Sequence, residues 1–314
     1  MSVMCDEIRT GDNWCLYNGD CCEVASGLPD ESIHFTVFSP PFSSLYVYSD
    51  SERDMGNCET DEEFWRHFGY LIPELLRVTK PGRLVSVHCM NLPSTISHNG
   101  YIGIRDFRGD VIRHFESHGF IYHSEVCIWK DPVVAMQRTK ALGLLHKQVC
   151  KDSAMSRQGI PDYVCTFRKP GQNPEPVAGG FEFFVGDSEE FEKRQKGNLS
   201  IDIWQRYASP VWMDINQSRV LKSYRDGRGE KDERHICPLQ LDVIERCVQL
   251  WSNPGDVVFS PFAGIGSEGH GALTLGRKFI GIELKPEYFE TACKNLAIAE
   301  SKKTVARLPF EDLE

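Results

Sequence analysis

The sequence lacks the features that would mark a membrane or secreted protein. No apolar run approaches the ~18 residues needed to cross a bilayer. The opening stretch, MSVMCDEIRTGD, lacks the basic residues and the apolar middle of a signal peptide. We therefore expect a cytoplasmic protein without a membrane partner.

The sequence also lacks the cysteine spacing of a zinc site. Its 12 cysteines are scattered along the chain, and no Cys-x-x-Cys pair supplies half of a metal-binding set. We expect reduced thiols and no metal ion.

An overall excess of basic residues is missing as well, and the net charge of −10 argues at first against a polyanionic partner. The charge is unevenly distributed. Residues 1–80 hold 15 acidic and 5 basic side chains, residues 130–170 hold 8 basic and 3 acidic ones, and residues 193–234 hold 10 basic and 6 acidic ones. The two basic segments could form one basic face, or they could be solvated surfaces without a partner.

Short apolar runs alternate with helical patterns along much of the 314-residue chain. The clearest helix follows Thr60, which has capping-box spacing to Glu63, and we expect it to end at Pro81 and Gly82. This alternation predicts an α/β fold with a doubly wound, mostly parallel, Rossmann-like sheet. The runs FIYHSEVCIW and DYVCTFRK have no obvious crossover helix of the usual kind between them, so we expect an antiparallel edge hairpin there.

The pattern changes at about residue 170, where prolines and glycines become frequent. It returns at CPLQLDVIERCVQLW, a predicted helix with Pro238 in its first turn. We therefore predict one catalytic domain formed by residues 1–169 and 236–314, with an insert at residues 170–235. Within the insert, Trp204 and Trp212 are more typical of a small packed core than of a ligand contact.

A glycine-rich turn is the most informative unit of the chain. In DVVFSPFAGIGSEGHGALTLGRKFIGIEL, a strand is followed by Gly264 and Gly266, a helix from Ser267, and a second strand that ends in Glu283. Such a turn lets backbone amides approach a ligand, and the acidic residue can accept hydrogen bonds from ribose hydroxyls. The glycine pattern of dinucleotide-binding sites has a third glycine, which this chain supplies only if Gly269 is counted. A plain tight turn without a ligand is therefore the alternative to a binding site. No lysine follows as in a P-loop, which argues against NTP hydrolysis.

A second unit, HFTVFSPPFSSLY, contains a strand that runs into two prolines. Proline cannot continue a sheet ladder and restricts the residue before it, so the chain must leave the sheet in a stiff corner. Taken alone, this corner would be a structural strand end with an exposed aromatic residue.

Four stretches of the chain carry a resemblance to a known family: SPPF, RVTKPG, HICPLQLDVIERCVQLWSNPGDVVFSPFAGIGSEG and GIELKPEYFETACKNL. Through them the chain resembles the DNA amino-methyltransferases that act on cytosine N4 or adenine N6. The order of motifs is similar to that of their β group, and the resemblance covers roughly residues 15–130 and 235–300. It implies S-adenosylmethionine as the cofactor, double-stranded DNA as the partner, and a bacterial or phage-infected cytoplasm as the location.

The resemblance also implies roles for single residues. The cofactor pocket would comprise Asp20, His235, Pro238, Phe262, Gly264, Gly266, Ser267 and Glu283. Glu283 would bind the ribose. The family usually has Asp where this chain has Ser260. This difference affects the polar contact expected near the amine of the methionine part of the cofactor.

The proline corner would form the catalytic site, with Ser39, Pro40, Pro41 and Phe42. An exocyclic amine is a poor nucleophile because its lone pair is delocalised into the ring. The hydroxyl of Ser39 and the carbonyl of Pro40 would accept its N–H groups and localise that pair, and Phe42 would stack on the base. The base must first be flipped out of the duplex, at a cost of a few kcal/mol.

Basic residues would help to offset that cost through phosphate contacts. The candidates are Lys130, Arg138, Lys140, Lys147, Lys151 and Arg157. A solvated surface helix is the alternative for this segment. The insert at residues 170–235 is the candidate for target recognition.

Ser39 favours cytosine N4 over adenine N6, because adenine-specific members more often carry Asp or Asn at this position. Two other classes stay open at this stage. One is a catalytically inactive DNA-binding module, which the missing Asp at position 260 keeps open, and the other is an RNA or protein-glutamine N-methyltransferase. A homodimer, the recognition sequence and a role in restriction-modification, regulation or phage anti-restriction are left undecided by the sequence.

Overall fold

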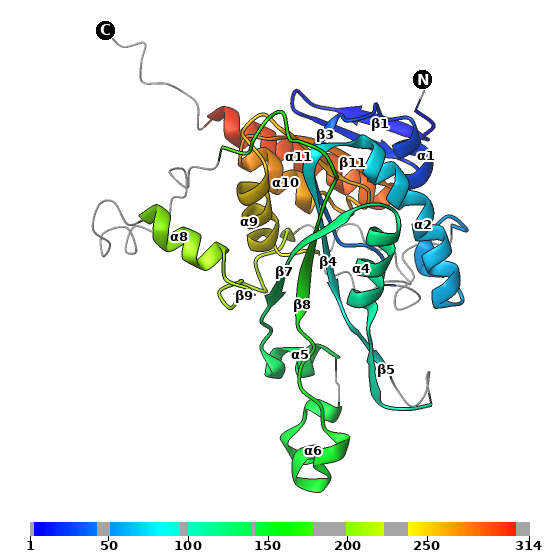
Figure 1. Ribbon diagram of the computed structural model, residues 1–314, viewed down its shortest axis with the longest axis vertical. Coiled ribbons are helices and arrows are strands. Elements are labelled where there is room, and N and C mark those ends of the chain that lie inside the picture. The colour runs from blue at the N-terminus through cyan, green and yellow to red at the C-terminus, as the bar shows by residue number, and fades with distance from the viewer. Residues whose placement is uncertain are drawn as a thin grey trace.

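The computed structural model describes residues 3–42, 51–94, 100–139, 142–178, 199–222 and 238–305. They form a nine-stranded mixed sheet covered by helices on both faces (Figure 1). Across the sheet the strands are β1 (Glu7–Thr10), β2 (Trp14–Asn18), β11 (Lys278–Glu283), β10 (Val257–Ser260), β3 (Ile33–Phe38), β4 (Thr79–Met90), β8 (Asp162–Arg168), β7 (Ile121–Ile128) and β9 (Val211–Trp212). A separate two-stranded sheet joins β5 (Leu92–Ser94) and β6 (Gly103–Arg105).

The five strands from β2 to β4 are parallel, and β8 pairs antiparallel with both β4 and β7. The predicted doubly wound, mostly parallel sheet and its antiparallel pair are therefore confirmed. The outer edge is not β7, however, because β9 from the predicted insert pairs with it in parallel.

Two hydrophobic cores lie on the two faces of this sheet. One core is covered by α1 (Cys21–Ser26), α2 (Asp61–Val78) and α4 (Phe107–Ser117), and the other by α9 (Leu241–Trp251), α10 (Ser267–Thr274) and α11 (Pro286–Val305). The remaining elements are η2 (Met55–Asn57), α5 (Pro132–Thr139), η3 (Leu142–Leu144), α6 (His146–Lys151), η4 (Ser153–Met155) and α8 (Leu199–Tyr207). No helix within the described ranges is long and apolar enough to span a membrane.

Helix α2 begins as the sequence predicts, because the hydroxyl of Thr60 accepts the N–H of Glu63 at 3.1 Å. It ends earlier than predicted, at Val78, because the hydroxyl of Thr79 donates to the carbonyl of Leu75 and caps the last turn. The prediction for Pro238 is wrong. Helix α9 begins at Leu241, whose N–H is bonded to the carbonyl of Arg219 outside the helix.

The described parts of the predicted insert pack onto the main sheet. Trp212 is 1% exposed, and its indole N–H donates to the carbonyl of Tyr207. The prediction of a core residue is thus confirmed for Trp212 and wrong for Trp204, which is 52% exposed. The assignment of residues 170–235 to a separate recognition domain stays a prediction.

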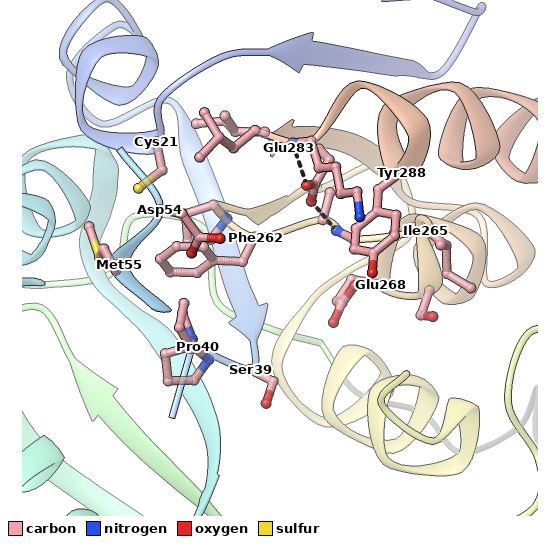
Figure 2. Close-up of a pocket in the computed structure, with 18 of the residues that line it drawn as sticks. Cys21, Ser39, Pro40, Asp54, Met55, Phe262, Ile265, Glu268, Glu283 and Tyr288 are labelled. Atoms are coloured by element: carbon pink, nitrogen blue, oxygen red, sulfur yellow. Dashed lines mark hydrogen bonds between the residues drawn. The ribbon is translucent and has the colours of Figure 1, made fainter. Parts of the chain in front are cut away.

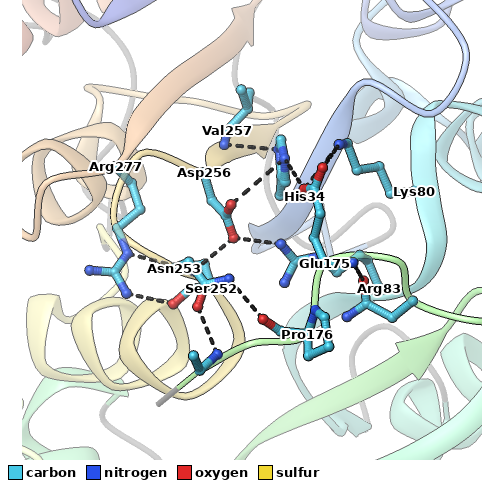
Figure 3. Close-up of polar contacts among 12 residues, drawn as sticks. His34, Lys80, Arg83, Glu175, Pro176, Ser252, Asn253, Asp256, Val257 and Arg277 are labelled. Carbon is cyan, nitrogen blue, oxygen red and sulfur yellow. Dashed lines mark hydrogen bonds and ion pairs between the residues drawn. The ribbon is translucent and has the colours of Figure 1, made fainter. Parts of the chain in front are cut away.

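The segment that leads into the insert is tied to the amino ends of the parallel strands (Figure 3). Glu175 lies 3.2 Å from both Lys80 and His34, and the side chain of Asn253 bonds the backbone of residues 176 and 178. Beside it, Arg83 is buried against Asp256 at 2.7 Å. These contacts fix the start of the insert at the end of the sheet opposite the pocket described below.

Candidate active site

The carboxyl ends of β3, β10 and β11 meet at one edge of the sheet. The three strands are parallel neighbours, so the residues that follow them come close together. A cavity of about 190 Å³ opens at this edge. Ten predicted site residues line it: Asp20, Ser39, Pro40, Pro41, Phe42, Pro238, Phe262, Gly264, Ser267 and Glu283. Gly266 lies in the same turn without lining the cavity, and His235 lies outside the described residues.

The glycine turn presents its backbone to this cavity. Gly264 and Gly266 have positive φ angles of 52° and 86°, a conformation that favours glycine. No atom lies within 4 Å of the place where a Cβ would stand on Gly264, whereas on Gly266 it would meet Ala292 at 3.3 Å. The turn is therefore open to a ligand at Gly264 and packed against α11 at Gly266.

Glu283 connects this turn to the end of β11. Its carboxylate accepts the N–H of Gly264 at 2.7 Å and the N–H of Lys285 at 2.9 Å. Desolvation raises the pKa of Glu283 to about 8, although these two bonds oppose the shift. Figure 2 shows Glu283 on one side of the pocket and Pro40 on the other, with Phe262 between them in this view.

The proline corner forms the opposite wall. Pro40 and Pro41 are buried, and the hydroxyl of Ser39 lies 3.1 Å from Nδ1 of His88 and 3.3 Å from its carbonyl oxygen. The ring of Phe42 packs edge-on against Phe107, with the ring centres 5.9 Å apart. The structure thus places a stiff corner, a hydroxyl and a partly exposed aromatic ring across the cavity from the glycine turn.

Comparison with known proteins agrees with this geometry. A family profile described as DNA methylase, of the N6/N4 type, matches residues 33–294. The type II methyltransferase M.XycI of Xanthomonas campestris pv. cyanopsidis is 36% identical over 303 residues, which cover 90% of this chain and 87% of that protein. The chain belongs to the N6/N4 DNA methylase family.

Other relatives of this methylase are more distant. M.BglII of Bacillus subtilis, also a type II methyltransferase, is 26% identical over 90% of this chain and 68% of its own. The solved structure of TTHA0409, a putative DNA modification methylase of Thermus thermophilus complexed with S-adenosyl-L-methionine, has a TM-score of 0.62. The two sequences are 23% identical, and the match covers 92% of this chain and 96% of the Thermus chain. That structure shows that the two proteins share a fold.

The methylase pocket contains acidic groups that sequence reasoning missed. Glu268, in the first turn of α10, is 4% exposed and lines the cavity, and desolvation raises its pKa to about 8. Asp54, the residue before η2, also lines the cavity, in a segment with no sequence signal for a site. The hydroxyl of Ser260 is buried and has no hydrogen-bond partner among the residues that the structure describes. An acidic residue directly after the glycine turn was the one available signal for Glu268.

The predicted phosphate-binding residues lie away from the pocket. Helices α5 and α6 form an arm at the lower end of Figure 1, and Lys147 and Lys151 are exposed on α6. Lys130 lies against Asp162 instead, with Nζ 2.5 Å from Oδ1, and Arg157 is half-buried. The side chain of Arg138 and all of Lys140 lie outside the described residues. Contact with DNA stays a prediction for this set.

Proposed function

We propose that this methylase transfers the methyl group of S-adenosylmethionine to an exocyclic amine of a base flipped out of double-stranded DNA, at a specific sequence. The cofactor is S-adenosylmethionine, as membership of this methyltransferase family implies. The observation that carries the proposal is the single cavity lined by Ser39 and Pro40 on one side and by Gly264 and Glu283 on the other. A base that enters from the corner would meet a cofactor seated on the turn.

Within this reaction, the corner acts on the amine. The hydroxyl of Ser39 and the carbonyl of Pro40 accept its two N–H groups, which localises the nitrogen lone pair for in-line attack on the methyl carbon. Phe42 holds the flipped base by stacking. Glu283 and the backbone at Gly264 hold the adenosyl part of the cofactor.

Cytosine N4 is the proposed target in preference to adenine N6, and Ser39 supports this choice. A neutral hydroxyl, rather than a carboxylate or amide, stands where the amine would bind. The insert at residues 170–235 is proposed to read the sequence around the target.

The test is to express the chain in cells that lack DNA methylases and to identify the methylated nucleosides in their DNA by mass spectrometry. We expect N4-methylcytosine with the natural chain and much less of it with Pro40→Ala. N6-methyladenine would overturn the choice of base. The absence of both, with the protein folded and able to bind S-adenosylmethionine, would overturn the proposed reaction.

A further inference from the structure

A line of polar groups leads away from the catalytic corner into the sheet. Nδ1 of His88 lies 3.1 Å from the hydroxyl of Ser39, and Nε2 of the same ring lies 3.3 Å from Oδ2 of Asp162. The second oxygen of Asp162 is 2.5 Å from Nζ of Lys130. None of these residues except Ser39 and Lys130 was singled out by a sequence motif.

The sheet itself brings these groups together. His88 lies near the carboxyl end of β4, beside the end of β3. Asp162 is the first residue of β8 and lies opposite Met90 of β4. Because side chains alternate across a strand, His88 and Asp162 project from the same face. Glu125 lies opposite Cys165 on the other face, where it pairs with Arg108. Among the described residues of these strands, the charged group in contact with His88 is Asp162, which in turn contacts Lys130.

The line is buried. His88 is 8% exposed and Asp162 is 2% exposed. Burial alone would raise the pKa of the Asp162 carboxyl, but the neighbouring His88 and Lys130 outweigh it and hold the pKa below its usual value. Asp162 therefore carries a negative charge at neutral pH.

A buried ion pair of this kind contributes little to stability compared with an apolar pair of the same size. Its alignment is also incomplete, since Nε2 of His88 is at ion-pair distance from Asp162 without a well-directed hydrogen bond. Both features suit a group that changes its charge during a reaction.

We propose that His88, held by Asp162, receives through Ser39 the proton that the target amine loses on methylation. This proposal rests on the proposed function and adds the route of the proton. His88 and Asp162 are positioning residues, because they act on the substrate through Ser39.

The step balances as follows. The amine nitrogen attacks the methyl carbon, the carbon–sulfur bond breaks, and its electron pair stays on sulfur to give S-adenosylhomocysteine. The nitrogen becomes cationic and passes one proton to Oγ of Ser39, while the hydroxyl proton of Ser39 passes to Nδ1 of His88. A neutral methylamino base and an imidazolium facing Asp162 result, and the imidazolium later releases its proton to solvent.

This route needs one tautomer of the resting imidazole. The proton must sit on Nε2, toward Asp162, so that Nδ1 offers a lone pair to Ser39. The negative charge of Asp162 favours that tautomer. In the competing arrangement, Ser39 donates to the carbonyl oxygen of His88 at 3.3 Å and no proton reaches the ring.

The first test measures single-turnover methylation against pH for the natural chain, His88→Gln and Asp162→Asn. The natural chain is expected to show a pH-dependent rate, because the proposed relay ends on an ionisable ring. His88→Gln should lower the rate on the order of a hundredfold and remove that dependence, with cofactor affinity unchanged. His123→Gln, which alters an exposed histidine on β7, is the matched control. An unchanged rate and pH profile in a folded His88→Gln would overturn the proposal.

The second test does not depend on activity. Nitrogen NMR of the histidine rings in the cofactor-free protein should show the proton of His88 on Nε2, and Asp162→Asn should weaken that preference. A proton on Nδ1 would overturn the relay. A natural chain that methylates no DNA would count against the proposed function instead, so the two failures can be told apart.

Discussion

The carboxylate of Glu283 accepts the backbone N–H of Gly264 at 2.7 Å, across the gap between the end of β11 and the turn that follows β10. One residue thereby fixes the shape of the turn and also lines the cavity. Glu268 adds a second carboxyl to the same cavity from the first turn of α10. The wall of the cavity formed by the glycine turn and α10 therefore carries two carboxyl groups, which would complement the positive charge of S-adenosylmethionine under the proposed function.

Cofactor affinity should rise with pH. Desolvation raises the pKa of Glu268 and of Glu283 to about 8, so both carboxyls are largely protonated at pH 7 without a ligand. A cationic ligand favours their charged forms and must release protons on binding. Calorimetry at pH 7 in buffers of different ionisation enthalpy should detect this release, and affinity should level off above about pH 8. A constant affinity between pH 6 and pH 9 would contradict the prediction.

Glu268→Gln should stabilise the cofactor-free protein at high pH. The pKa of this carboxyl is higher in the folded state than in the unfolded chain, so the folded state loses stability as the pH rises from about 4.5 through about 8. Glutamine removes that loss. The melting temperature should increase at pH 8.5 and change little at pH 5, while cofactor affinity falls. An equal shift at both pH values would show that the effect is not electrostatic.

Much of this arrangement follows from local sequence signals. The glycine turn and the proline corner each end a strand, and parallel strands place such ends at one edge. That is why Ser39 and Gly264 could be predicted to share a cleft. The start of α10 at Ser267 and the end of β11 at Glu283 were likewise predicted and are confirmed.

Other features depend on contacts between distant segments. The two-residue strand β9 has no periodicity of its own and exists because its backbone pairs with β7. His88 and Asp162 lie on separate strands, and only the register of β4 with β8 brings them together. Neither the burial of Glu268 nor the exposure of Trp204 can be derived from residue type.

Ser39→Ala should lower the methylation rate on the order of a hundredfold, because the amine then loses an acceptor that the stiff corner holds in place. Cofactor affinity should stay the same, since Ser39 lies across the pocket from Gly264. Rates at saturating cofactor, together with a cofactor titration, separate the two effects. A parallel loss of cofactor binding would show that Ser39 contributes to cofactor binding, which would contradict the prediction.

Replacing Lys147 and Lys151 together with alanine should weaken DNA binding uniformly across sequences. The slope of log affinity against log salt should become shallower by about 1 for each lysine that pairs with a phosphate in the natural chain. Lys278→Ala is the matched control, because this exposed lysine begins β11 at the end of the sheet away from the pocket. If affinity and salt slope match those of the control, α6 does not lie on the DNA.

Trp212→Ala should destabilise the whole domain and not the insert alone. The indole is 1% exposed, and the guanidinium of Arg246 on α9 lies 4.8 Å from its ring centre and 4.6 Å from that of Tyr207. Truncating a buried tryptophan costs about 3–5 kcal/mol, and here it also removes one of the two aromatic rings that contact the Arg246 side chain. Denaturant unfolding followed at several probes should show one transition at a lower midpoint.

The matched control is Trp204→Ala, which removes an exposed indole from the same segment. If Trp212→Ala changes neither cofactor binding nor the unfolding midpoint, the packing of Trp212 does not stabilise the catalytic domain. The predicted insert would then behave as an independent module.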